Sequence, residues 1–149
     1  MRTILQRVRS GRVIVNQETV GEIGHGYVIL LGITHTDGPA DIKRLAEKVV
    51  HLRVFEDDQG KMNLSALDTG AEMLVVSQFT LYADSKKGRR PSFTQAGPPE
   101  IAEPLVDQFV AQLRQLGVRN VASGVFGAHM LVEIQNDGPV TIILDTSEL

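Results

Sequence analysis

The apolar residues of this chain occur mainly in short runs that glycine, proline and polar turn residues interrupt. The densest of them, residues 27–31, lies between Gly26 and Gly32. Runs of this length suit buried β-strands and are far too short to span a bilayer. The 149 residues favour a single domain, residues 1–149, whose one core is large enough to fold without disulfides or a metal.

Two longer segments show the spacing of an amphipathic helix, and each begins at a proline, Pro39 or Pro98-Pro99. With the strands they predict an α+β fold: a mainly antiparallel sheet or partly closed β-barrel with two main helices. The predicted strands are residues 2–8, 13–15, 20–23, 27–33, 73–76, 119–123, 128–134 and 140–144. The apolar stripes of the helices are Ile42, Leu45, Ala46, Val49 and Val50, and Ala102, Leu105, Val106, Phe109, Leu113 and Leu116.

Composition narrows the range of functions. The net charge of -3 argues against a protein coated by nucleic acid, although one local basic patch is compatible with it. The absence of cysteine excludes disulfides, thiolate metal sites and cysteine nucleophiles. No apolar signal-peptide core follows Met1, so we expect a cytoplasmic protein without a membrane partner. The histidines, His25, His35, His51 and His129, lack the spacing of a zinc helix, and we predict neither a metal nor a cofactor.

The segment Ser77-Gln78-Phe79-Thr80 continues the apolar strand 73–76, at the point where small polar residues begin. Small hydroxyls at a strand end often line a site on a rigid scaffold. The plainer interpretation is a strand end that uses Ser77 and Thr80 for local hydrogen bonds. The local pattern alone favours this plainer interpretation.

The segment Asn136-Asp137-Gly138-Pro139 lies between two predicted strands, where Asp-Gly indicates a hairpin turn. Pro139 is less ordinary, because proline removes a backbone donor where the next strand begins. An X-Pro bond also admits the cis isomer, and the sequence does not say which isomer Gly138-Pro139 adopts. The local pattern again favours an ordinary turn.

A basic run follows the polar strand end and contains Lys86, Lys87, Arg89 and Arg90. One interpretation is a solvated loop. The other is a contact with a nucleic-acid backbone, because clustered cations displace the counterions of phosphates. The sequence supports both equally.

The ordered set of short motifs along the whole chain resembles the D-aminoacyl-tRNA deacylase family, also called the D-tyrosyl-tRNA deacylase family. Each motif alone is weak, but their order across essentially all 149 residues is highly specific. The signature pair is Ser77-Gln78-Phe79-Thr80 and Asn136-Asp137-Gly138-Pro139-Val140-Thr141. The other motifs are Leu5-Gln6-Arg7-Val8, Gly21-Glu22-Ile23-Gly24, Arg53-Val54-Phe55, Gly60-Lys61-Met62-Asn63, Arg90-Pro91-Ser92-Phe93 and Gly124-Val125-Phe126-Gly127-Ala128-His129-Met130.

The resemblance implies a D-tyrosyl-tRNA deacylase-like fold and a hydrolase that cleaves the ester bond of D-aminoacyl-tRNA. It implies a homodimer with each active site at the subunit interface, and the aminoacylated 3′ end of tRNA as partner. Gly138-Pro139, expected to be cis, would reach into the partner's site and reject L-residues by steric clash. Glycine has no side chain to clash, so mischarged glycyl-tRNA is also an expected substrate.

The resemblance also assigns roles to individual residues. The catalytic segment is Ser77, Gln78, Phe79 and Thr80, in which backbone N–H groups stabilise the oxyanion and Thr80 is not a nucleophile. Arg7 would support the Gly-Pro pair. Contacts with the tRNA backbone would come from Lys86, Lys87, Arg89 and Arg90. Substrate binding and rejection of the L-enantiomer would come from Phe126, Met130, Gly138 and Pro139. A salt bridge for Arg7 and a core position for Met130 remain open.

Three other functions remain open at this point. A sister deacylase with a trans Gly-Pro acts on L-alanyl-tRNA(Thr). A non-catalytic tRNA-binding module would use the basic run without turnover. A serine esterase built on Ser77 would need a base in reach, and the histidines offer no pattern that supplies one. D-aminoacyl-tRNA deacylation is the leading hypothesis, and nearly all of the support for it comes from the resemblance.

Overall fold

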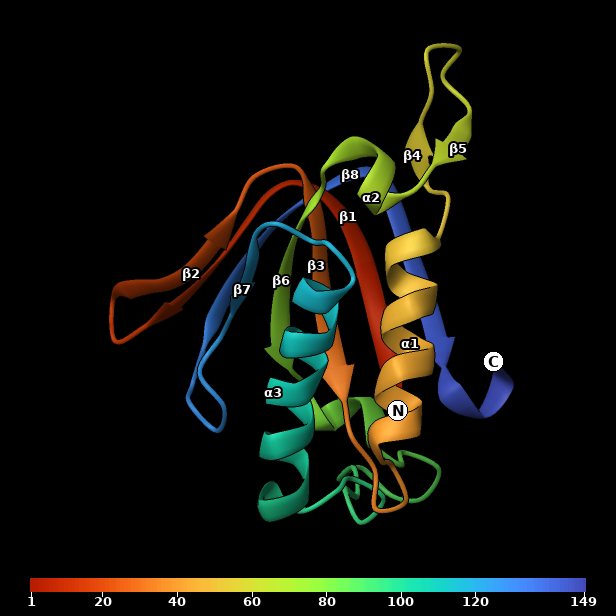
Figure 1. Ribbon diagram of the computed structural model, residues 1–149. Helices are drawn as coiled ribbons and strands as arrows, with labels where there is room; N and C mark the ends of the chain where they lie inside the picture. The colour runs from red at the N-terminus through yellow and green to blue at the C-terminus, as the bar shows by residue number, and fades with distance from the viewer.

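The computed structural model describes all 149 residues and places a bent sheet against two long helices (Figure 1). Helices α1 (Pro39–His51) and α3 (Pro99–Gln115) both have proline in their first turn, as predicted. A short helix α2 (Ala66–Thr69) is additional. The remaining elements are β1 (Arg2–Val15), β2 (Glu18–Ile23), β3 (Gly26–Gly32), β4 (Phe55–Glu56), β5 (Met62–Leu64), β6 (Glu72–Ser77), β7 (Val121–Ser123), β8 (Leu131–Asp145) and the 3-10 helices η1 (Phe79–Tyr82) and η2 (Thr146–Glu148).

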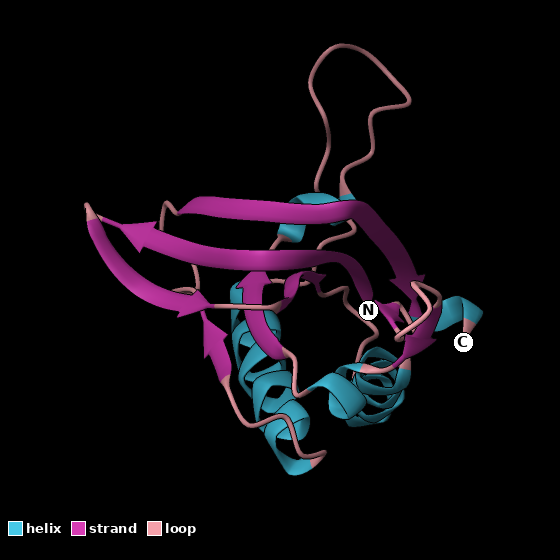
Figure 2. Ribbon diagram, turned by 90° about the horizontal axis from the view of Figure 1, so that it is seen from above, coloured by secondary structure: helices cyan, strands magenta, loops and turns pink.

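Strand β1 is the centre of the sheet, because it pairs antiparallel with β2, β3 and β8. Strands β6 and β7 then extend the sheet in parallel from β3. Figure 2 shows the strands bending towards one another as an incomplete ring, against which α1 and α3 pack. The ring nearly closes where β2 meets β7, since a Cβ added to Gly21 would lie 2.7 Å from the carbonyl oxygen of Ser123. The predicted α+β fold with a partly closed barrel is confirmed.

Two apolar cores stabilise this arrangement. The larger core lies between the sheet and the helices. It contains every predicted stripe residue of both helices except Leu116, which packs against it partly buried. None of the helices has the length and apolar character that crossing a membrane requires. The smaller core consists of Val8, Val13, Ile23, Val28, Leu74 and Val76.

The predicted turn at residues 136–139 is wrong, because β8 runs unbroken through it. Both flanks of this segment pair with β1. Between the flanking pairs β1 has one residue, Arg7, and β8 has four, residues 137–140, so the extra residues bulge while the strand continues. Pro139 is tolerated there because β8 is an edge strand that pairs with β1 alone.

Two other predicted strand boundaries also differ from the structure. Strand β6 ends at Ser77, and residues 78–80, which the sequence predicted as a continuation of strand 73–76, instead turn into η1. The backbone N–H of Gln78 makes a last hydrogen bond to Leu31 O at 2.8 Å, after which the chain leaves β3. The strand predicted over 128–134 begins only at Leu131, so Met130 lies in the preceding loop.

Candidate active site

A pocket of about 330 Å³ opens at the carboxyl ends of the parallel strands β3 and β6. Parallel strands present their carboxyl ends at one edge of a sheet, where ligands commonly bind. The start of η1, the first turns of α3 and the loop before β8 complete the pocket. Its lining residues are Leu31, Ile33, Ser77, Gln78, Phe79, Ala96, Gly97, Pro99, Ala102, Val106, Phe126 and Gly127.

None of these side chains titrates, so the pocket contains no general base of its own. Its polar groups are the side chains of Ser77 and Gln78 and the backbone around them. Phe79 and Thr80 begin η1, and the first N–H groups of a helix have no acceptor within it. The site can therefore orient a substrate and donate hydrogen bonds to an oxyanion.

The structure brings most of the predicted catalytic and binding residues to this pocket. Thr80 is exposed beside it, and its Oγ1 accepts a hydrogen bond from Gln78 Nε2 at 2.5 Å. Four of the predicted residues line the pocket itself: Ser77, Gln78, Phe79 and Phe126.

Met130 does not line the pocket. It is partly buried against the smaller core. Its sulfur packs over Gly124, where an added Cβ would lie 2.5 Å from it. This packing agrees with the core position that the sequence left open for Met130.

One wall of the pocket is the segment 94–97, of which Ala96 and Gly97 line the cavity, and this wall has no signal in the sequence. Thr34 Oγ1 donates a hydrogen bond to Gln95 O at 2.6 Å, across 61 positions of the chain. The N–H of Gly97 donates to Ile33 O at 2.8 Å. A Cβ on Gly97 would lie 3.2 Å from Thr34 O, so the two backbones are in close contact. This pairing joins distant, irregular segments, and no periodicity reveals it.

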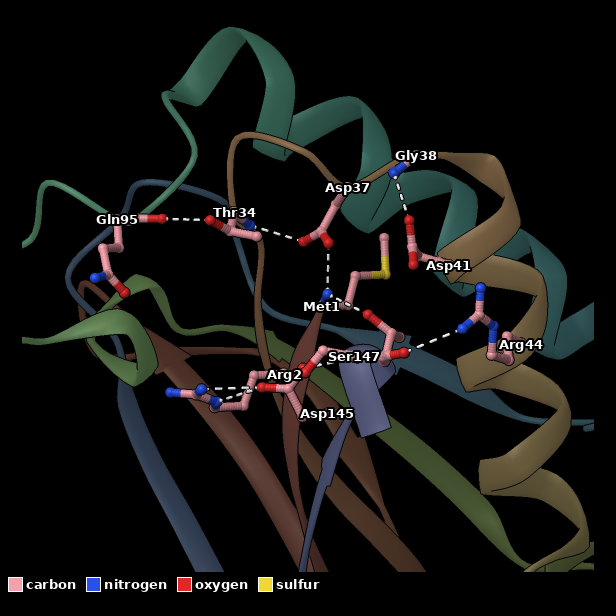
Figure 3. Close-up of polar contacts among 11 residues, drawn as sticks. Met1, Arg2, Thr34, Asp37, Gly38, Asp41, Arg44, Gln95, Asp145 and Ser147 are labelled. Atoms are coloured by element: carbon pink, nitrogen blue, oxygen red, sulfur yellow. Dashed lines mark hydrogen bonds and ion pairs between the residues drawn. The ribbon is translucent and has the colours of Figure 1, made fainter. Parts of the chain in front are cut away.

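Thr34 is fixed in turn by a buried ion pair at the start of β1 (Figure 3). Asp37 Oδ2 accepts a hydrogen bond from the Thr34 N–H at 2.7 Å, and Asp37 Oδ1 lies 2.5 Å from the Met1 ammonium. The ammonium also donates to Thr146 Oγ1 at 2.7 Å. The side chain of Asp37 is only 5% exposed, so salt screens this pair weakly. The pocket wall is therefore attached to the amino-terminal end of β1.

The bulge of β8 carries the second predicted element of the site. The peptide bond between Gly138 and Pro139 is cis, and both residues are exposed. Arg7 lies beneath them with 5% of its surface exposed. Its Nη1 donates to Val54 O at 2.7 Å and its Nε donates to Asp137 O at 3.2 Å. Arg7 thus joins the carbonyl before Gly138 to the chain segment that leads into β4.

Arg7 lies beside one carboxylate and one buried phenol. Glu56 Oε1 lies 3.5 Å from Arg7 Nη2. Burial raises the pKa of the neighbouring Tyr27 phenol, while the charge of Arg7 partly opposes that rise, so Tyr27 stays neutral. Arg7 therefore supports the bulge as a cation with one exposed carboxylate nearby.

The Gly138-Pro139 bulge and the pocket lie at opposite ends of β3. Arg7, which contacts the bulge, pairs with Tyr27 at the start of β3, whereas Leu31 lines the pocket at its end. Four residue steps of a strand span about 13 Å. Figure 1 shows the middle of β8 crossing the top of the sheet, whereas β3 ends towards the bottom. The length of β3 therefore separates the two elements within this chain.

The predicted basic residues Lys86, Lys87, Arg89 and Arg90 are all exposed in one loop. Backbone hydrogen bonds of 2.8 and 2.9 Å between Asp84 and Ser92 close this loop at its base. None of the four side chains pairs with a carboxylate, whereas every arginine of β1 does. The loop is a concentration of free positive charge.

Comparison with known proteins identifies the family of this chain. The sequence profile of the family described as D-Tyr-tRNA(Tyr) deacylase matches residues 4–145. A protein of Chloroflexus aurantiacus named D-aminoacyl-tRNA deacylase is 59% identical over 149 residues, which cover 100% of this chain and 92% of that protein. A protein of Clostridioides difficile with the same name is 51% identical over 148 residues and covers 99% of both chains.

Solved structures show the same fold. A protein described as "c-Myc DNA Unwinding Element Binding Protein" superimposes with a TM-score of 0.92 at 43% identity, covering 97% of this chain and 98% of that one. A probable eukaryotic D-amino acid tRNA deacylase shares the fold, with a TM-score of 0.80 at 21% identity over 96% and 97% of the two chains. The predicted D-tyrosyl-tRNA deacylase-like fold is confirmed. By profile and by sequence identity, this chain belongs to the D-Tyr-tRNA(Tyr) deacylase family.

Proposed function

We propose that this chain hydrolyses the ester bond of D-aminoacyl-tRNA in the cytoplasm, releasing tRNA and the D-amino acid. Its family supports a hydrolase that acts on aminoacyl-tRNA esters. The observation that carries the proposal is the pocket lined by Ser77, Gln78 and Phe79, in which no side chain titrates. An aminoacyl ester is already activated, so a site that orients it needs no strong base of its own.

Catalysis in this pocket rests on orientation and on stabilisation of negative charge. The N–H groups of Phe79 and Thr80 donate to the oxyanion that develops on the ester carbonyl. The 2′-hydroxyl of the terminal ribose helps to activate water, which makes the reaction partly substrate-assisted. Thr80 positions the substrate together with Gln78, its hydrogen-bond partner, and forms no acyl-enzyme. Phe126 provides an apolar seat for the terminal adenine.

Chirality is selected by Gly138 and Pro139 of a second subunit. Their carbonyls crowd one side of the substrate α-carbon, so a D side chain points to solvent and an L side chain collides. A thousandfold preference requires about 4 kcal/mol, which a rigid clash supplies. Glycyl-tRNA lacks the colliding group and is a further expected substrate.

The exposed edge of β8 supports a homodimer. The strand pairs only with β1, which leaves its other edge without a backbone partner. Leu131 and Ile143 on this strand are 60% and 67% exposed. A long strand edge with exposed apolar side chains is a surface suited to a symmetric contact, in which each of two copies uses its own β8 edge to cover that of the other. A second copy also supplies the Gly138-Pro139 bulge that the pocket of one subunit lacks.

The basic loop supports contact with the tRNA itself. Its four free cations follow η1 closely along the chain, and η1 begins at the pocket. Single-stranded RNA that leaves the pocket therefore meets unpaired positive charge, which favours binding through counterion release.

The test is single-turnover deacylation of D- and L-tyrosyl-tRNA by the purified protein with EDTA present. The proposal predicts rapid loss of the D-ester and survival of the L-ester. Loss of neither ester despite measurable tRNA binding would overturn the proposal and leave either a binding module or the sister activity. Cleavage of L-alanyl-tRNA(Thr) in place of both would identify the sister activity.

A further inference from the structure

Two phenylalanine rings are exposed together at the mouth of the pocket. Phe79 is 56% exposed and Phe93 is 37% exposed. Their ring centroids lie 5.0 Å apart at an interplanar angle of 73°, an edge-to-face contact. Single exposed apolar residues are common on protein surfaces. Here one ring of the pair also lines the pocket, so the aromatic surface continues from the pocket to the outside.

The residues directly before and after Phe93 are both fixed by hydrogen bonds. Before it, Ser92 exchanges two backbone hydrogen bonds with Asp84. After it, the pocket wall 94–97 is attached to Thr34, which the buried carboxylate of Asp37 fixes. The ring therefore forms part of a built surface.

The same segment brings positive charge to the rings. Arg90 precedes Phe93 by three residues, and three residues of chain span at most about 11 Å. The hydrogen-bonded base of the loop keeps Lys86 and Lys87 on the other arm of the same loop. Aromatic faces beside a basic stretch are the combination with which proteins bind single-stranded nucleic acid, because bases stack while cations follow the backbone.

We propose that Phe79 and Phe93 form a stacking platform for the nucleotide that precedes the terminal adenosine of tRNA. This inference rests on the proposed function, which places the terminal adenosine and its aminoacyl ester in the pocket. The exposed end of the platform receives the next base, and the loop 86–90 neutralises the phosphates that follow it. The enzyme thereby recognises more than the aminoacyl-adenosine.

The test compares two substrates, D-tyrosyl-tRNA and 3′-O-D-tyrosyl-adenosine. Both carry the terminal adenosine with its ester, but only the tRNA contains the preceding nucleotide and the rest of the RNA. Phe93→Leu removes the aromatic face and keeps an apolar side chain. We expect it to raise KM for D-tyrosyl-tRNA about tenfold with kcat nearly unchanged, and to leave D-tyrosyl-adenosine hydrolysis as in the wild type. Phe93→Trp restores a stacking face and should restore KM.

Ile101→Ala is the matched control, because Ile101 is also 37% exposed but has no place in the aromatic pair. It should leave both substrates unaffected. An equal change for both substrates in Phe93→Leu, no change for either, or an altered oligomeric state by light scattering would overturn the platform. Failure of the wild type to cleave either substrate would instead overturn the proposed function.

Discussion

Gly138 adopts a backbone conformation and a position that both exclude a side chain. Its φ is +124°, and a Cβ added there would lie 2.8 Å from Val140 Cγ2 and 3.1 Å from Arg7 Nη2. Gly138→Ala must therefore displace the bulge that we propose as the chiral selector. We expect the ratio of D- to L-tyrosyl-tRNA hydrolysis rates to fall at least about tenfold, which corresponds to a loss of only about 1.4 kcal/mol of discrimination.

Gly60→Ala controls for the backbone strain of this substitution. Gly60 also has a positive φ, +73°, but a Cβ there would meet nothing within 4 Å. Single-turnover rates with both enantiomers measure the two variants side by side. An unchanged D/L ratio in Gly138→Ala would remove Gly138 from the selection of chirality.

Asp37 is the residue on which the pocket wall and the start of β1 both depend. Asp37→Asn keeps the size of the side chain but leaves the Met1 ammonium without its carboxylate. Breaking one partner of a buried ion pair typically costs about 3–5 kcal/mol of unfolding free energy. Urea denaturation should show this loss as a lower midpoint. An equal slope of unfolding free energy against urea for the wild type and the variant would indicate that their unfolded states are comparable.

The control for this prediction is Asp41→Asn, four positions along the chain. Asp41 accepts a hydrogen bond only from the Gly38 N–H, at 3.0 Å, and so caps α1 without contacting the pocket wall. An asparagine side-chain oxygen can still accept this hydrogen bond, so the substitution should cost less than the ~1 kcal/mol of a lost cap. Equal destabilisation by the two substitutions would show that the Met1 pair contributes nothing beyond an ordinary cap.

Among the larger elements, those with a dense local signal could be predicted from the sequence. Strand β3 is an apolar run between glycines, and helices α1 and α3 have an apolar stripe after a proline. Strand β8 could not be predicted as one element, because Asp137-Gly138 and Pro139 are local turn signals. The hydrogen-bonded pairing of β8 with β1 on both sides of these residues overrides the turn signals. This pairing joins segments that are far apart in the sequence, so no local pattern reveals it.

The loop of residues 86–90 makes a prediction at the scale of an element. Replacing Lys86, Lys87, Arg89 and Arg90 together by Ala should weaken tRNA binding and flatten its dependence on salt. For single-stranded RNA each lost phosphate contact reduces the slope of log K against log salt by about 0.7. Titrations at several salt concentrations measure this slope, and a slope equal to that of the wild type would return the loop to a solvated surface.

The candidate site also shows which features the sequence could indicate. Ser77, Gln78, Phe79 and Phe126 stand in motifs of the family, and all of them line the pocket. The wall at residues 94–97 could not be predicted, because its attachment to Thr34 depends on the tertiary fold. Met130 belongs to a family motif as well, but the space above Gly124 draws it into the smaller core.

For the whole molecule, the central claim is that one catalytic site needs two subunits. The pocket and the Gly138-Pro139 bulge lie at opposite ends of β3, and β8 leaves a free edge. A symmetric dimer can bring the bulge of each subunit to the pocket of the other. Two variants, each defective in one of the two elements, should therefore repair one another when they share a dimer.

The most direct measurement mixes the chirality variant Gly138→Ala with about a tenfold excess of the pocket variant Gln78→Ala by joint refolding, so that nearly all Gly138→Ala subunits enter mixed dimers. In such a dimer the intact pocket of the Gly138→Ala subunit faces the intact Gly138 of the partner subunit. The account predicts that D-tyrosyl-tRNA hydrolysis per Gly138→Ala subunit, and its preference over the L-ester, return to the wild-type values. A D/L ratio that stays at the value of Gly138→Ala alone would show that each subunit uses its own bulge, and would contradict the shared site.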